Sequence, residues 1–249
     1  MLERRWKAAY LLFLVCVSFS TLCLLVAITV LGPRVADGFA WRRPLSGSIF
    51  SLLCVLGIVA VLFPQHCARR PQKESLFSQG SYSSLQKEPY LQKSSFVGGL
   101  TVTHGHHPSC DRYRQHEFVV GKKTLCCACL GLFCGALISL AAACYVFLLQ
   151  GPYGLPDGIA FALGIVGIAF GLAPYVIAES LGPVRRFCFN ALMIIGMFLA
   201  LVAIDSRVQS SALNALLIGF FIFVLFTRIS LSQDKHERIC AACEQPCAT

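Results

Sequence analysis

Long stretches without a charged side chain constrain the fold of this chain more than any other feature. Six runs of at least sixteen residues contain no Asp, Glu, Lys or Arg: residues 10–31, 48–63, 127–149, 158–178, 187–204 and 212–227. A helix needs about 20 mostly apolar residues to cross a hydrocarbon core about 30 Å thick. Together with a mean hydropathy of +0.69, these runs predict an all-α membrane protein.

We predict six transmembrane helices from these runs. The second and last runs are short, so five is the alternative count, although a short span can also lie in a locally thinned bilayer. The first run follows the basic residues Arg4, Arg5 and Lys7, as the apolar part of a signal peptide does. It is longer than that part usually is, and no small-x-small cleavage site follows at once, so we expect this helix to be retained.

Basic residues are distributed unevenly between the two sides that six spans define. The amino terminus, the loops after spans two and four, and the carboxyl tail share one side, which carries 17 Lys and Arg residues. The other side carries four: Arg34, Arg42, Arg43 and Arg207. The positive-inside rule then predicts a multi-pass protein of the cell membrane with both termini in the cytoplasm.

The same distribution accounts for the net charge of +9. No nucleic-acid-binding motif accompanies the basic residues. We therefore expect the lipid bilayer as the partner, together with other membrane subunits as a further option, and we expect no nucleic acid.

The chain divides into five parts by composition. They are an N-terminal two-helix hairpin (1–64), a flexible cytoplasmic linker (65–95), a Cys/His-rich cytoplasmic segment (96–129), a four-helix transmembrane bundle (127–230) and a cytoplasmic Cys-rich tail (231–249). In the Cys/His-rich segment, β-prone runs at 100–103 and 117–120 flank turn residues and predict a small hairpin-like fold. Because about 30 residues bury too little apolar surface, we expect a metal, a disulfide or a neighbouring segment to stabilise it.

The fourteen cysteines form two groups. Six lie in or beside the predicted spans, where cysteine behaves as a small apolar residue: Cys16, Cys23, Cys54, Cys134, Cys144 and Cys188. The other eight lie on the predicted cytoplasmic side with all six histidines: Cys67, Cys110, Cys126, Cys127, Cys129, Cys240, Cys243, Cys247, His66, His104, His106, His107, His116 and His236. A reducing cytoplasm disfavours stable disulfides, so this grouping indicates metal binding or thiol redox chemistry.

Two candidate metal sites follow from the spacing of these residues. The loop supplies His104, His106, His107, Cys110, His116, Cys126 and Cys129, and the tail supplies His236, Cys240, Cys243 and Cys247. Zinc prefers four thiolate and imidazole ligands, and a Cys-x-x-Cys pair brings two thiolates together within one turn. One zinc site made from both segments is equally allowed, and polar side chains without a metal, or a disordered tail, are the alternatives.

The Cys-x-x-Cys pair begins a longer pattern at the entry to the third span. Residues 126–135 read CCACLGLFCG, a Cys-x-x-Cys-x-Gly-x-x-x-Gly run that follows a segment with His and Cys. Over roughly residues 104–149 this pattern resembles the membrane family called domain of unknown function 2085, although Ala128 stands where the family has Arg. The resemblance implies a prokaryotic integral membrane protein and brings no established activity.

Pairs of glycines four residues apart occur in the third and fourth spans. Gly131 with Gly135, and Gly167 with Gly171, form small-xxx-small steps. Such steps let two helix backbones approach closely in a membrane. We therefore expect these glycines to serve helix packing.

Motifs of known chemistry are missing from the sequence. It has no His-Glu-x-x-His, Gly-x-Ser-x-Gly, P-loop or Cys-x-x-Cys-His, so an enzyme is disfavoured and no catalytic residue is assigned. The predicted spans hold no Asp, Glu, Lys or Arg, which weakens a transporter hypothesis. We expect a scaffold or regulatory membrane protein with a structural zinc site. The alternatives are a metal-ion or small-solute transporter with a cytoplasmic Cys/His site, and a membrane thiol-redox protein.

Overall fold

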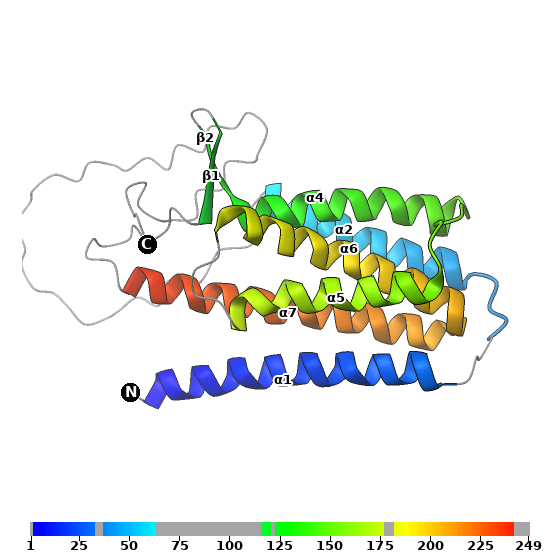
Figure 1. Cartoon of the computed structure of the whole chain (residues 1–249), viewed down its shortest axis with the longest axis horizontal. Helices are drawn as coiled ribbons and strands as arrows, with labels where there is room; N and C mark the ends of the chain where they lie inside the picture. The colour runs from blue at the N-terminus through cyan, green and yellow to red at the C-terminus, as the bar shows by residue number, and fades with distance from the viewer. Residues whose placement is uncertain (1, 33–36, 63–115, 121–122, 177–181, 242–249) are drawn as a thin grey trace, which may run out of the picture.

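The computed structural model describes residues 2–32, 37–62, 116–120, 123–176 and 182–241. Within these residues the chain forms the helices α1 (Leu2–Leu31), α2 (Arg42–Leu62), α4 (Cys127–Ala143), α5 (Asp157–Val176), α6 (Pro183–Val208) and α7 (Ser211–Ala241). A π-helical turn, η2 (Cys144–Leu148), continues α4. The strands β1 (Glu117–Val120) and β2 (Lys123–Cys126) form an antiparallel hairpin. Figure 1 shows the helices as one bundle, with the hairpin at the end where α1 begins and α7 ends.

Five of the described helices are long and apolar enough to cross a membrane. They lie at Trp6–Leu31, Arg42–Leu62, Cys127–Leu148, Pro183–Val208 and Ser211–Lys235. In α5 the apolar part, Asp157–Ala173, is shorter. The fold is therefore that of a multi-pass, all-α membrane protein, as predicted from the sequence.

The lengths of individual spans differ from those we predicted. The two runs that looked short belong to long helices, because α2 begins at Arg42 and α7 continues past Arg228. Both helices include arginines at which a charge-free run ends. The fold holds these arginines against polar partners, so the helices continue through them.

The central element of the bundle is α6. Its buried side chains extend along nearly its whole length, from Arg186 to Val208. It packs between α4 and α5 and also contacts α7, while α2 packs against α4 and η2, and α1 packs against α7. The first two helices thus have different main partners, and both of them contact α7.

The hairpin and the tail also differ in part from the prediction. β1 coincides with the predicted run 117–120, but its partner is β2, which the sequence did not indicate as a strand. The run at 100–103 and the linker 65–95 lie outside the described residues. The expected tail begins as helix, because α7 continues without a break to Ala241.

The four glycines singled out in the sequence lie where α6 crosses its neighbours. A Cβ at Gly131 would lie 2.3 Å from the carbonyl oxygen of Phe187, and one at Gly135 would lie 2.7 Å from that of Ala191. On α5, a Cβ at Gly167 would lie 2.7 Å from the Leu192 carbonyl oxygen, and Gly171 faces the Met193 side chain. At three of these positions the obstacle is backbone, so a side chain could be accommodated only by separating the helices.

A single methyl group at the α4–α6 crossing should therefore destabilise the bundle. We expect Gly131→Ala to lower the free energy of unfolding by about 1–3 kcal/mol, the usual cost of overpacking a core. The measurement is the unfolding midpoint of the purified protein in detergent micelles.

Gly219 of α7 provides the matched control, because a Cβ there would meet no atom within 4 Å. Gly219→Ala should leave stability unchanged or raise it, since Ala is the better helix former. Equal destabilisation by the two substitutions would show that the crossing is not tightly packed.

Candidate functional site

The junction between the hairpin and α4 holds three of the sequence-predicted ligands that the structure describes: His116, Cys126 and Cys129. β2 ends at Cys126, and α4 begins at the next residue, Cys127. Cys126 pairs with Glu117 across the hairpin, which places His116 just beyond this pair. The Cys126, Cys127 and His116 residues are all buried. The hairpin register therefore brings a histidine and the Cys-x-x-Cys motif to one place.

The two thiols of the Cys-x-x-Cys motif are in contact. The Cys126 and Cys129 side chains share a hydrogen bond. Cys126 precedes the first turn of α4, and Cys129 lies within that turn. This arrangement is the one that two thiolate ligands of a metal, or the two cysteines of a redox pair, would need.

The remaining predicted ligands are distributed as follows. His236 and Cys240 lie on the last turns of α7, at the end of the bundle that carries the hairpin. His104, His106, His107, Cys110, Cys243 and Cys247 lie outside the described residues. Among the residues that the structure does describe, no group of three or more His, Cys, Asp and Glu side chains is arranged to hold a metal ion.

Two buried arginines beside the cysteines escaped the sequence analysis. Arg186 of α6 and Arg228 of α7 are only 4% and 6% exposed. Arg228 Nε donates to Asn190 Oδ1 over 2.7 Å, and Asn190 Nδ2 donates to the Arg186 carbonyl oxygen over 2.6 Å. The charge of Arg186 acts on Cys127, and that of Arg228 acts on Cys129. The thiols thus lie within the field of two buried cations.

A second polar cluster occupies the opposite end of the bundle, around Asp205 of α6. This residue is 1% exposed. Its Oδ1 accepts from Arg42 Nε at 2.9 Å and from Asn214 Nδ2 at 2.7 Å, and its Oδ2 lies 3.3 Å from Arg43 Nε. Asn214 also donates to Ser46 Oγ over 3.1 Å. One carboxylate therefore joins α2, α6 and α7, and burial of such a charge is tolerable because it accepts two hydrogen bonds and pairs with a second arginine.

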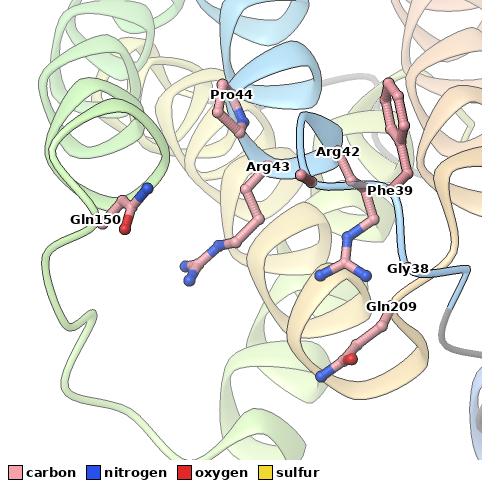
Figure 2. A pocket seen from close by; sticks show the side chains of 8 residues that line it. Gly38, Phe39, Arg42, Arg43, Pro44, Gln150 and Gln209 are labelled. Atoms are coloured by element: carbon pink, nitrogen blue, oxygen red, sulfur yellow. The ribbon is translucent and has the colours of Figure 1, made fainter.

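A hollow opens beside this cluster. Figure 2 shows Arg43 between Gln150 and Arg42, with Gln209 below Arg42. The hollow measures about 310 Å³, and a second of about 340 Å³ shares these four residues. The sequence analysis counted Arg42 and Arg43 only as loop charges, because no local pattern connects them with Asp205, which is more than 160 positions away.

The two polar clusters are separated by an apolar layer. Every buried residue of α6 between Asn190 and Asp205 is apolar, and so is every buried residue of α7 between Asn214 and Thr227. At 1.5 Å per residue the layer is about 20–22 Å thick. On these two helices no buried polar side chain links one cluster to the other.

Comparison with protein-family models, with curated proteins and with solved structures finds no match for this chain. The class of this protein therefore rests on its structure alone. The protein is a multi-pass α-helical membrane protein with a thiol pair at one end of the bundle and an Arg–Asp cluster at the other.

Removing the Asp205 charge should destabilise the bundle strongly. Asp205→Asn keeps the side-chain size but leaves Arg42 and Arg43 without their shared carboxylate. We expect a loss of about 3 kcal/mol, at the low end for a broken buried ion pair, because the Arg43 side chain is 40% exposed. Chemical or thermal unfolding in detergent micelles measures this loss.

Asp234 is the matched control, since it also pairs with two cations. Its partners, Lys7 and Arg238, are 43% and 71% exposed. Asp234→Asn should cost less than about 1 kcal/mol, as exposed ion pairs do. If the two substitutions cost the same, Asp205 is not the central support that its contacts indicate.

Asp37, in the segment between α1 and α2, gives the protein a defined response to acid. Ser211 lowers the pKa of Asp37 from its usual value of 3.8 through its hydroxyl and its backbone N–H, with help from Phe39 and Arg42. A carboxyl with a lowered pKa stabilises the fold above its unfolded pKa and loses that contribution as pH falls through the folded value. The melting-temperature advantage of the wild type over Asp37→Asn should therefore be constant near neutral pH and shrink below about pH 4. An advantage that does not change with pH would contradict this assignment.

Proposed function

We propose that this protein is a membrane scaffold or regulatory protein in which a structural zinc ion fastens the Cys/His-rich segment to the helix bundle. The hydrogen-bonded Cys126 and Cys129 side chains carry this proposal. They lie where the hairpin joins α4, so a metal held there would tie the extramembrane segment directly to a transmembrane helix.

The donor set suits zinc. Two cysteines separated by two residues supply two thiolates from one turn, and the buried His116 directly precedes Glu117, which pairs with Cys126 across the hairpin. We place the other ligands among His104, His106, His107 and Cys110 of the loop, or His236, Cys240, Cys243 and Cys247 of the tail. Since α7 ends on the same side as the hairpin, a site that uses loop and tail together is sterically reasonable (Figure 1).

We further propose that this end of the bundle faces the cytoplasm. The support is the excess of Lys and Arg on that side, 17 against four. A reducing compartment would keep the thiols available to a metal. We also propose that residues 104–149 share an ancestor with the family called domain of unknown function 2085, which their sequence pattern resembles.

Thiol redox chemistry is the second candidate, because two thiols in contact are also suited to forming a disulfide. Transport is less well supported. A transporter places polar or ionisable groups near the middle of the membrane, whereas the buried parts of α6 and α7 form an apolar layer there.

Metal analysis of the purified protein tests the zinc proposal. We expect about one zinc per chain in the wild type and loss of most of it in Cys126→Ser and in Cys129→Ser, with a lower melting temperature in both. Cys188→Ser is the control, since Cys188 is an exposed cysteine of α6, and it should retain the metal.

The alternative has its own signature. A wild-type protein that contains no metal, and whose Cys126 and Cys129 convert reversibly between dithiol and disulfide, would replace the zinc proposal with the redox candidate. Zinc content that is equal in wild type and both serine variants would place any metal elsewhere.

A further inference from the structure

The hollow around Arg43 lies at the end of the bundle away from the thiols and has no part in the proposed zinc site. The hollow consists of two adjoining spaces, and four side chains line both of them: Arg42, Arg43, Gln150 and Gln209. They come from the start of α2, the turn after η2 and the end of α6. Three separate segments thus converge on one opening.

Two guanidinium groups line this hollow. Among the described residues that line the space of about 310 Å³ there is no carboxylate. In the adjoining space Asp205 is the acidic side chain, and it already accepts from Arg42 and Asn214. Both arginines are paired with carboxylates, since Arg42 also lies 4.0 Å from Asp37, yet the first space itself is lined by their hydrogen-bond donors.

Arg43 is the side chain best placed to bind an occupant. Its Nε lies 3.3 Å from Asp205 Oδ2, as an ion pair in which this nitrogen forms no hydrogen bond. The Arg43 side chain is 40% exposed, against 13% for Arg42, which is held between Asp205 and Asp37. Figure 2 shows the Arg43 side chain between Gln150 and Arg42, with Gln209 below Arg42. A guanidinium fork with an amide donor beside it matches an oxyanion, because it can donate two parallel hydrogen bonds.

The surroundings place this hollow at the level of lipid head groups. Trp41 and Phe39 precede α2 and are 70% and 47% exposed. Exposed aromatic side chains at the end of a transmembrane helix are typical of the membrane–water interface. At about 310 Å³ the hollow is at the small end of ligand pockets, large enough for a phosphate group with its substituents.

We propose that this hollow binds a phosphate group, with the Arg43 guanidinium as its main ligand and the Gln150 and Gln209 amides as flanking donors. The phosphate belongs either to an anionic phospholipid head group or to a small soluble phosphate. Both sources offer the same oxyanion to the same donors, and binding measurements can distinguish them.

The test uses the whole chain purified in a neutral detergent. Binding of inorganic phosphate, short-chain phosphatidylglycerol and short-chain phosphatidylcholine is measured by calorimetry and by the shift in melting temperature. We expect saturable binding of phosphatidylglycerol, of phosphate or of both, weakened by salt. Binding of phosphatidylglycerol without phosphate identifies a lipid site, and preferential binding of free phosphate identifies a soluble ligand.

Substitutions then locate the binding. Arg43→Gln should weaken it about 10- to 100-fold, the effect of losing hydrogen bonds to a charged group. Gln150→Leu leaves the Arg42, Arg43 and Asp205 contacts in place and should weaken binding about 5-fold. Arg185→Gln, at an exposed arginine on the first turn of α6 at the other end of the bundle, should bind as the wild type does.

Three results would overturn the proposal. The first is no saturable binding of either phosphate-containing anion at millimolar concentration. The second is binding that Arg43→Gln and Gln150→Leu leave unchanged. The third is an equal loss in Arg185→Gln, which would indicate general attraction to a basic surface. Because Gln150→Leu keeps the Arg–Asp cluster, these results can be read even if Arg43→Gln folds poorly.

Discussion

The arrangement of the bundle depends on a single carboxylate at one end of its central helix. Asp205 is almost fully buried, and its two oxygens face Arg42, Arg43 and Asn214. Loss of one of these partners would leave a buried charge uncompensated, which is costly. Asp205 therefore specifies how α2 and α7 meet α6, whereas apolar contacts alone would allow these helices to slide or rotate. The glycine crossings of α4 and α5 supply close packing nearer the other end of α6, between Phe187 and Met193.

The overall class of the fold could be predicted from the sequence, because membrane helices follow from local composition. The ends of the helices could not be predicted equally well. A charge-free run stops at Arg43 and at Arg228, whereas the helices continue because Asp205 pairs with Arg43 and Asn190 accepts from Arg228. Such pairings join residues far apart in the chain, and no window of sequence contains both partners. β1 was recognised from its own residues, whereas its partner β2 was missed although only residues 121 and 122 separate the two strands.

The residue types of the candidate site could be predicted from the sequence, but its geometry only in part. The Cys-x-x-Cys spacing already indicates that Cys126 and Cys129 can share a ligand, and the structure brings their side chains together. Arg186 and Arg228 had been counted as loop charges, yet they are buried within the bundle beside these thiols. Their positions in the sequence held a partial signal. Each arginine lies directly beside a charge-free run and is four residues from a small or polar residue, which would lie on the same face of a helix. What the sequence could not supply is the direction in which each side chain turns.

The absence of any intervening residue between β2 and α4 has a mechanical consequence. Cys126 ends the strand and Cys127 begins the helix, so the hairpin and the helix share a continuous backbone with no loop to absorb a change in angle. A displacement of the hairpin therefore acts on the first turn of α4 directly. α4 is also pressed against the backbone of α6 through Gly131 and Gly135, so the displacement would act on the centre of the bundle. The hairpin is thus connected to the membrane-embedded core through α4, which joins β2 at one end and packs against α6 along its length.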